Sequence, residues 1–360
     1  MLVKYLSLIL ILLSACQVFL GPDPDTSDTG VLYSLWKDFN EIHAYIQIRM
    51  DRNPRYESWD DVFEHYNTRL EKNEIDLFSA STRMLGELED PHVSLYATSG
   101  YLYSLGNSFY TYRNNYSFAS EKNEFIEMTR NLLTDRGTMT EDNMLLYGSF
   151  ISDPHIGYLF ISQFVDRFNP TDSFNWVETV DESIDFFREN TSVVIIDIRY
   201  NTGGLIPALE YIAARFAAVK SDYIMASTKN GPGPDDFSSP LTFRITPAVI
   251  SYTKPVVVLT NKVSMSASEW FTLAMRNQPH AIHLGLSTAG AFSIRTTRPM
   301  INGWYYSISA HKVTDMEGLC YEGFGVRPQV EITGAPEPQW AVHPGNQLKA
   351  VLEWINENKL

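Results

Sequence analysis

The second half of the chain alternates short, continuous apolar runs with segments of helical spacing, and no other feature of the sequence limits the fold as strongly. Between the apolar runs, hydrophobic residues recur at every third or fourth position over residues 176–187 and again over 209–216. Buried strands interleaved with amphipathic helices predict an α/β core around a largely parallel sheet. The apolar runs with strand character are residues 156–161, 193–198, 256–260, 281–285 and 304–309.

The first half of the chain has helical spacing instead. Apolar residues recur at helical intervals between Leu32 and Leu88, which predicts about three packed helices. The aromatic-rich stretch 101–116 supports no assignment. We therefore expect an N-terminal helical region at residues 31–150, an α/β core at 151–335, and an amphipathic helix at 336–360 that packs on this core.

The N-terminus has the proportions of a secretory signal. A short positive region precedes the apolar run 5–13, which is too short for a permanent transmembrane helix, and Leu-Ser-Ala-Cys at residues 13–16 closes the segment. This ending resembles a bacterial lipobox and implies a lipoprotein signal peptide at residues 1–16, with lipid attachment at Cys16. Residues 17–30 suit a flexible tether. We therefore expect a lipid-anchored protein of the bacterial cell envelope. Gln17 after the cysteine, rather than Asp, resembles the enteric sorting signal for the outer membrane and implies that membrane. An ordinary secretory signal is the alternative.

Composition and charge argue against several classes of function. A chain of 360 residues with 44% hydrophobic residues can bury a sizeable core. Its formal net charge of -15, with no basic cluster, argues against a nucleic-acid partner. Apart from Cys16 the only cysteine is Cys320, so no intramolecular disulfide can form after processing, and Cys320 fits a small apolar filler. We expect no metal, because paired ligand spacing is absent around His43, His65, His155, His283, His311 and His343.

A serine follows one of the apolar runs and opens a helical segment. The stretch 264–269, Ser-Met-Ser-Ala-Ser-Glu, lies between the strand-like run 256–260 and the helical pattern that begins at Trp270. At a helix N-terminus the Ser266 hydroxyl would lie near unpaired backbone N–H groups and the positive end of the helix dipole, which stabilise an oxyanion. Ser266 and Glu269 also have the spacing of a capping box, in which the serine only caps the helix. The stretch alone leaves both roles open.

Paired glycines follow another buried run. Asp197 and Arg199 stand at the end of that run, and Gly203 and Gly204 come shortly before Pro207, a favourable first helical residue. Glycine lets the backbone approach a ligand closely and turn its N–H groups toward it. The motif has neither the Gly-Lys-Ser/Thr ending of a P-loop nor the dinucleotide-binding glycine pattern. It is either a ligand-binding turn or a tight connection between strand and helix, and we expect Asp197 and Arg199 to hold the strand end.

Five separated motifs are more specific together than any one alone. They are Glu-Asp-Pro-His-Val at 89–93, Asp-Ile-Arg-Tyr-Asn-Thr-Gly-Gly at 197–204, Ser-Ala-Ser-Glu at 266–269, Gly-Leu-Ser-Thr-Ala-Gly at 285–290 and Glu-Gly-Phe-Gly-Val-Arg-Pro at 322–328. In this order they resemble the C-terminal processing peptidase family, which includes the tail-specific proteases and the core of tricorn protease. The resemblance implies a crotonase/ClpP-like α/β core with Ser266 as the nucleophile. The tail-specific members carry a PDZ domain, for which the stretch between His92 and Ile156 is too short here.

The resemblance also implies a change of catalytic base. Most bacterial members use a serine-lysine dyad, but Ala291 stands where the lysine is expected, and a methyl group cannot accept a proton. The tricorn-like branch uses serine, histidine and glutamate, which implies His92 as the base and Glu322 as the residue that orients it. Other interpretations stay open. His92 could be a loop histidine at the helix end after Leu88, and Lys262 or Lys312 could act as a substitute base if desolvated.

We therefore expect a serine endopeptidase of the cell envelope with polypeptide substrates and with no metal or organic cofactor. The oxyanion would be held by the N–H of Ala267, the residue after the nucleophile, together with that of Gly203 or Gly204. One alternative is a non-catalytic binding protein on the same fold, like the interphotoreceptor retinoid-binding protein, because the dyad lysine is absent. Another is an esterase or acyltransferase, which would share the triad and differ in the acceptor.

Overall fold

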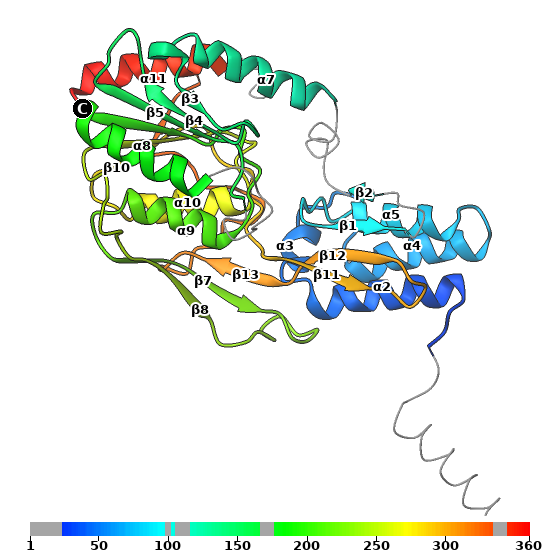
Figure 1. Ribbon diagram of the computed structural model, residues 1–360. Coiled ribbons are helices and arrows are strands. Elements are labelled where there is room, and N and C mark those ends of the chain that lie inside the picture. Colours follow the sequence, from blue (N-terminus) through cyan, green and yellow to red (C-terminus); the bar gives the residue numbers. More distant parts are fainter. Residues whose placement is uncertain (1–23, 98–101, 105–115, 166–175, 334–343) are drawn as a thin grey trace, which may run out of the picture.

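The computed structural model has two parts, which Figure 1 shows side by side. It describes residues 24–97, 102–104, 116–165, 176–333 and 344–360. The N-terminal helices and a small sheet form one part, and a larger layered core forms the other. The predicted signal peptide with Cys16 lies outside the described residues, as does most of the stretch 101–116. In the described ranges, no helix combines the length and the apolar character that crossing a membrane requires.

The helical part forms because three of its helices have polar N-caps and one apolar face. Ser27, Ser58 and Asp76 each accept a hydrogen bond from a backbone N–H of the first turn. The apolar faces pack into one hydrophobic core together with Tyr306 and Ile308 from a later strand. As predicted, the segment from Leu32 to Leu88 is a group of packed helices. They are α2 (Asp28–Ile42), α3 (Ile46–Met50), α4 (Trp59–Glu71) and α5 (Leu77–Gly86).

A four-stranded antiparallel sheet packs on these helices. Its order is β11-β12-β1-β2, and Ser94 of β1 lies opposite Ser307 of β12. The prediction that the run 304–309 joins the parallel core sheet is therefore wrong, because this run forms β12 beside the N-terminal helices. A short apolar run shows that a strand is buried but not which sheet it joins. The strands are β1 (Ser94–Tyr96), β2 (Leu102–Ser104), β11 (Arg295–Pro299) and β12 (Tyr305–Ser309).

The core contains a seven-stranded sheet in the order β14-β10-β9-β6-β5-β4-β3. Strands β5, β6, β9, β10 and β14 are parallel, as the continuous apolar runs predict, so the α/β class is confirmed. β3 and β4 add an antiparallel edge, although they lie in the stretch assigned to the helical region. The strands are β3 (Thr138–Met139), β4 (Leu145–Ser149), β5 (Ile156–Ile161), β6 (Val193–Asp197), β9 (Val256–Thr260), β10 (Ala281–Gly285) and β14 (Val330–Glu331).

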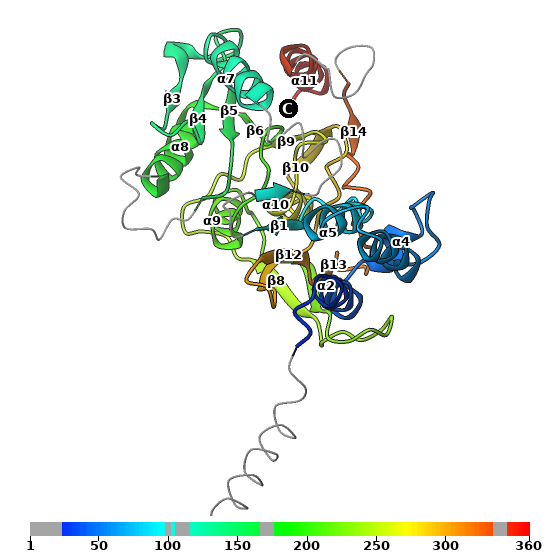
Figure 2. The same cartoon turned by 90° about the vertical axis from the view of Figure 1, so that its right-hand side faces the viewer.

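Helices cover both faces of the core sheet (Figures 1 and 2). Alternate strand residues point to opposite faces, so Ile196 and Val258 pack with α8, α9 and α10, whereas Ile195 and Val257 pack with α7 and α11. α11 also contacts α7 and β10, which places the C-terminal helix on the core. The helices are α7 (Tyr116–Arg130), the short 3-10 helix η1 (Thr134–Arg136), α8 (Trp176–Asn190), α9 (Ile206–Arg215), α10 (Ala267–Arg276) and α11 (Pro344–Asn358).

A third sheet extends from the core. Its strands pair antiparallel in the order β13-β7-β8. β13 directly follows β12, so the chain returns from the helical part to the core at Ala310. The strands are β7 (Ser221–Thr228), β8 (Leu241–Ile245) and β13 (His311–Thr314).

Candidate active site

Ser266 lies at the turn between β9 and α10 and has an unusual backbone. The chain leaves β9 at Thr260 and enters α10 at Ala267, with Ser266 as the N-cap residue. Ser266 has φ 56° and ψ -123°, a conformation that residues other than glycine rarely adopt. Such strain persists only where surrounding contacts hold it, and it is concentrated at functional sites. The predicted order of strand, turn, serine and helix is confirmed.

The carboxylate of Glu269 holds the serine turn. It is fully buried, and it accepts hydrogen bonds from Ser266 N–H at 3.0 Å, Gly290 N–H at 2.6 Å, Ala291 N–H at 2.8 Å and the Thr288 hydroxyl at 2.7 Å. Burial raises the pKa of Glu269 to about 7, while these hydrogen bonds act in the opposite direction. The bond from Ser266 N–H is the glutamate half of the predicted capping box. The other three tie the serine turn to the segment that contains Ala291.

The three backbone N–H groups implied for an oxyanion hole have different surroundings. Ala267 is the first residue of α10, so its N–H has no acceptor within the helix. Gly204 is exposed, and its N–H takes no part in the hydrogen bonds that bridge this turn to Phe164. The N–H of Gly203, in contrast, donates to the Asn201 side chain at 2.8 Å.

Gly203 packs directly on Ser266. It has φ +103°, and a Cβ at this position would lie 2.7 Å from Ser266 Cβ and 3.1 Å from Ser266 Oγ, so this close approach requires glycine. Sequence reasoning missed Asn201, which holds the arrangement together. Its carbonyl accepts from Met265 N–H at 3.2 Å and from the Ser268 hydroxyl at 2.9 Å. The glycine pair and the serine turn therefore form one packed unit.

Ala291, where the resemblance implies a missing lysine, lies against the serine turn. Its carbonyl accepts from Ser266 N–H at 3.1 Å, and its own N–H donates to Glu269. Its methyl group is fully buried and packs with Met265. If Ser266 is a nucleophile, its proton acceptor must therefore come from a residue other than Ala291.

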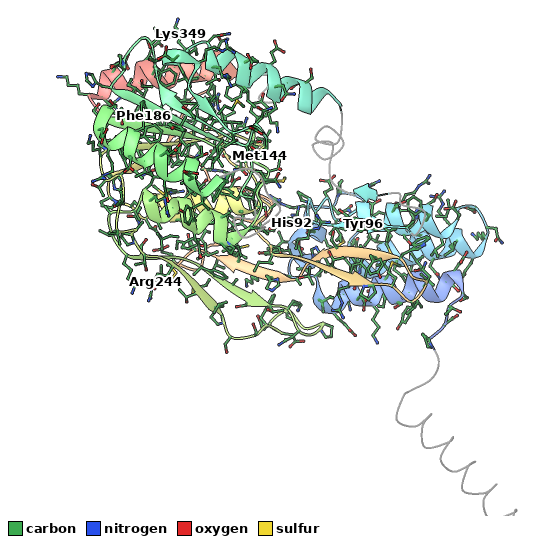
Figure 3. The ribbon with its side chains drawn as sticks, in the orientation of Figure 1. His92, Tyr96, Met144, Phe186, Arg244 and Lys349 are labelled. Atoms are coloured by element: carbon green, nitrogen blue, oxygen red, sulfur yellow. The ribbon has the colours of Figure 1, made fainter. Side chains whose placement is uncertain are left out.

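His92 belongs to the helical part of the molecule. It lies in the turn between α5 and β1, at the boundary between the two parts (Figure 3), and is only 5% exposed. Its backbone N–H donates to Asp90 at 2.8 Å, and its carbonyl accepts from the Ser307 hydroxyl at 2.7 Å. The turn and strand β12 therefore both fix the main chain of His92.

A buried charge cluster adjoins this turn. His43 Nε2 and one Asp90 oxygen lie 2.9 Å apart, and Arg49 lies 4.0 Å from the other Asp90 oxygen. Burial by itself raises the pKa of Asp90, but Arg49 and His43 outweigh burial and hold this pKa well below its usual range. Arg49 also donates to the Glu89 carbonyl at 3.0 Å. Sequence reasoning missed Arg49 altogether, because a lone arginine in a helical pattern carries no signal of such contacts.

Glu322 belongs to the same cluster and also contacts segment 291–292, which lies against the serine turn. Its fully buried carboxylate forms an ion pair with Arg49 and accepts from Phe292 N–H at 2.7 Å. Neither of these contacts is with His92. Burial raises the pKa of Glu322 to about 8, against the opposing effect of Arg49. Because Phe292 follows Ala291, one short segment contacts both Ser266 and Glu322.

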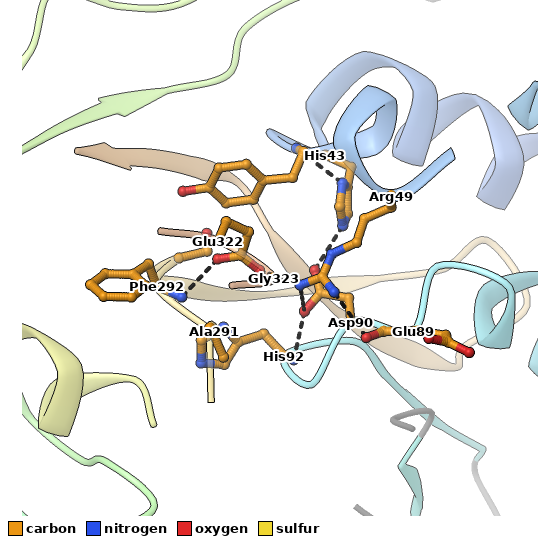
Figure 4. A network of polar contacts seen from close by, with 12 residues as sticks. His43, Arg49, Glu89, Asp90, His92, Ala291, Phe292, Glu322 and Gly323 are labelled. Carbon is orange, nitrogen blue, oxygen red and sulfur yellow. Dashed lines mark hydrogen bonds and ion pairs between the residues drawn. The ribbon is translucent and has the colours of Figure 1, made fainter. Parts of the chain in front are cut away.

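These contacts join segments that lie far apart in the sequence. Figure 4 shows the network that runs from His43 through Asp90 and Arg49 to Glu322, with the main chain of His92 attached at Asp90. Segment 291–292 then connects Glu322 to the serine turn. These contacts, with the peptide link between Ala291 and Phe292, connect the main chains of His92 and Ser266 to the Glu322 carboxylate.

The other residues considered for the site have separate surroundings. Asp197 and Arg199 hold the strand end as predicted: Arg199 is fully buried, pairs with Asp197 at 2.6 Å and donates to Gln347 of α11 at 3.1 Å. Burial lowers the pKa of Lys262, which is the direction that a lysine base requires. Lys312 lies on β13. Lys262 therefore stays the second candidate base.

In the part of the chain that the structure describes, Cys320 and the other histidines form no candidate metal cluster. Burial raises the pKa of the Cys320 thiol, as expected for an unreactive filler. His283 is buried with Nε2 2.6 Å from the Thr260 hydroxyl, and burial lowers its pKa to about 3. His343 lies outside the described residues. Within the described part of the chain, no three His, Cys, Asp or Glu side chains are grouped so that they could hold a metal ion.

Comparison with known proteins connects this geometry to a family. Residues 155–332 match the model of peptidase family S41. The carboxy-terminal processing protease CtpB of Bacillus subtilis is 28% identical over 139 residues, which are 39% of this chain and 27% of that protein. A CtpA-like serine protease of Staphylococcus haemolyticus is 27% identical over 164 residues, which are 46% of this chain and 32% of that protein. The matched region thus spans less than a third of the length of either relative.

Solved structures share the fold over most of the chain. A candidate peptidase from Parabacteroides merdae has a TM-score of 0.71 at 22% identity, covering 92% of this chain and 97% of that one. Mature CPAF complexed with lactacystin has a TM-score of 0.64 at 13% identity, covering 91% of this chain and 97% of that one. At these identities the likeness establishes the fold alone. The match over residues 155–332 includes Ser266, Ala291 and Glu322, and it confirms the resemblance: this segment is a peptidase family S41 domain.

Proposed function

We propose that the protein is a serine peptidase in which Ser266 is the nucleophile. The observation that carries the proposal is the positive φ of Ser266 at the start of α10. Among the described residues, Ser27 and Ser58 also cap helices, and both have ordinary extended backbones with φ -61° and φ -145°. A strained backbone costs about 1–3 kcal/mol, and capping a helix does not require it. The strain therefore supports a catalytic role for Ser266 beyond capping.

In the proposed reaction, Ser266 Oγ attacks the carbon of a peptide carbonyl while His92 accepts the hydroxyl proton. The carbonyl oxygen becomes an oxyanion, which the N–H groups of Ala267 and Gly204 would stabilise, since the N–H of Gly203 already donates to Asn201. His92 then gives its proton to the leaving amine. Water, activated by the same histidine, releases the acyl group.

We assign Glu322 as the acidic partner of His92. A carboxylate has about four acceptor sites, and Arg49 and Phe292 N–H use two of those on Glu322. A buried anion near the imidazole stabilises the imidazolium that forms during the reaction, and this stabilisation is larger away from water. Burial favours the protonated form of Glu322 and the ion pair with Arg49 opposes it, so the carboxylate gains the charge that this role needs as the pH rises through its pKa of about 8.

Polypeptides are the proposed substrates, since the relative CtpB is named a carboxy-terminal processing protease. We further propose that the mature protein is anchored through a lipid on Cys16 in the bacterial envelope, which rests on the N-terminal sequence alone. Incorporation of labelled palmitate during expression in bacteria tests the anchor. The label should be present in the wild type and absent after Cys16→Ala.

Digestion of an unstructured protein such as casein, with mass spectrometry of the products, tests the proposed activity. Ser266→Ala should abolish cleavage, and His92→Gln should lower kcat/KM by about 100-fold or more. Lys262→Met separates the two candidate bases, because it leaves cleavage intact if His92 is the base.

Each alternative function has its own result. Cleavage that survives Ser266→Ala would reject the nucleophile. Hydrolysis of small esters, or acyl transfer to amines, without cleavage of peptides would favour an esterase or acyltransferase. A wild-type protein with none of these activities would favour a binding protein on the same fold.

A further inference from the structure

Arg49 connects the part of the molecule that carries His92 to the part that carries Ser266. It lies in the short helix α3 and is only 7% exposed. Its guanidinium reaches out of the helical part and donates through Nη2 to the Glu322 carboxylate of the core (Figure 4). The same group donates through Nη1 to the Glu89 carbonyl at 3.0 Å. One planar, forked donor therefore bridges the two parts.

The Glu89 carbonyl belongs to the turn that leads into His92. Glu89 has φ 48°, a left-handed backbone that a residue other than glycine keeps only where its neighbours hold it. Asp90 follows; it lies 4.0 Å from Arg49 and accepts the backbone N–H of His92. The main chain of His92 is thus connected to Arg49 through two consecutive residues.

Arg49 is also the cation that faces both buried carboxylates of the cluster. Asp90 and Glu322 are fully buried, and the charge of Asp90 contributes to raising the pKa of Glu322. Two carboxylates that share a dry site repel each other unless a cation lies between them. A lysine would keep the charge, but it lacks the planar fork with which arginine donates to Glu89 and Glu322 at once.

We propose that Arg49 is a positioning residue of the hydrolytic site. By binding Glu322 and the turn 89–92 together, it fixes where His92 lies relative to Ser266. The inference rests on the proposed function of Ser266 and His92, and it adds a residue that acts through Glu322 and the turn rather than on the reacting atoms.

Arg52 supports the same junction from the outside. It donates to the Gly323 carbonyl at 2.8 Å, and its guanidinium carbon lies 3.9 Å from the centre of the Phe324 ring. Gly323 has φ +75°, and a Cβ there would lie 2.1 Å from the Arg52 side chain. The residues next to Glu322 are therefore also held by the helical part.

The rate at which a fluorophosphonate probe modifies Ser266 in the full chain tests this inference. We expect Arg49→Lys to lower the second-order rate constant by about 10- to 100-fold, because small displacements of reacting groups have effects of this size. In peptide hydrolysis the same variant should lower kcat and leave KM nearly unchanged. A general loss of folded protein would lower only the apparent kcat, and this effect disappears when kcat is calculated per folded molecule. Arg55→Met is the matched control: Arg55 pairs with Glu87 in the same helical part, its side chain is 63% exposed, and its loss should leave the rate unchanged.

Rates are taken per folded molecule, with the folded fraction measured by near-ultraviolet circular dichroism. If Arg49→Lys does not fold, Arg49→Ala is compared at low temperature with and without methylguanidinium, which should restore part of the rate. A folded Arg49→Lys with the wild-type rate, or an Arg49→Ala rate that methylguanidinium does not raise, overturns the inference. A wild-type protein that does not react at Ser266 refutes the proposed function, and this inference with it.

Discussion

Replacing Gly203 with alanine should displace the proposed nucleophile. A Cβ at Gly203 would lie 2.7 Å from Ser266 Cβ, 3.0 Å from the Met265 carbonyl oxygen and 3.1 Å from Ser266 Oγ. Carbon atoms prefer a separation of about 3.5–4.0 Å, so the serine turn must move by about 1 Å. A displacement of about 1 Å at reacting groups costs about 100-fold in rate. We therefore expect Gly203→Ala to slow the reaction of Ser266 with a fluorophosphonate by about this factor.

Gly318→Ala is a matched control for the backbone part of this change. Gly203 and Gly318 have φ +103° and +84°, so alanine costs about 1–2 kcal/mol at either position. A Cβ at Gly318 would have no atom of the described residues within 4 Å, whereas a Cβ at Gly203 meets the serine. The two variants therefore share the backbone cost and differ in the steric contact.

Two quantities are measured for each variant: the second-order rate of phosphonylation, and the free energy of unfolding from a urea titration. Gly318→Ala should lose about 1–2 kcal/mol and react at the wild-type rate. Gly203→Ala should lose more stability and react about 100-fold more slowly. Equal rates for the two folded variants would refute the claim that Gly203 packs against a reactive serine.

Three further substitutions test other parts of the structure. Glu269→Gln removes one acceptor oxygen and leaves two of the four donors unsatisfied. The free energy of unfolding should therefore fall by about 2–6 kcal/mol. A fall below about 1 kcal/mol in a urea titration would contradict this. Arg199→Met leaves the buried charge of Asp197 unpaired and should lower the free energy of unfolding by about 3–5 kcal/mol. Arg188→Met breaks a largely exposed pair and should lower it by about 0–1 kcal/mol. Equal losses for the two variants would argue against the buried pair. His283 has its pKa lowered from 6.5 to about 3, so the folded protein binds fewer protons than the unfolded chain, and stability should fall by about 1.4 kcal/mol per pH unit as pH drops through this range. Acid unfolding followed by circular dichroism should be shallower for His283→Gln, and identical profiles would contradict the assignment.

Local sequence patterns were sufficient for the core strands and for the serine turn. Strands β5, β6, β9 and β10 could be predicted because a strand covered by helices on both faces must be apolar at every position. The position of Ser266 at the start of α10 followed from a polar residue placed between an apolar strand and an amphipathic helix. Glu269 could be predicted as a cap from its spacing, since capping is a contact within one turn.

Contacts between distant segments could not be predicted from spacing. Arg49 and Glu322 are 273 positions apart, and neither has a sequence pattern that marks the pair. The pairing of β12 with β1 likewise depends on how the chain returns to the helical part between β10 and β11. For the same reason, the bonds that Glu269 accepts from Gly290 and Ala291 appear only once the chain has folded back after β10.

Peptide mapping of the fluorophosphonate adduct tests most directly whether Ser266 is a hydroxyl activated by His92. We predict a single modification on Ser266, absent from Ser266→Ala and formed at least about 100-fold more slowly in folded His92→Gln. Modification at a different residue, or an unchanged rate in His92→Gln, would contradict this assignment.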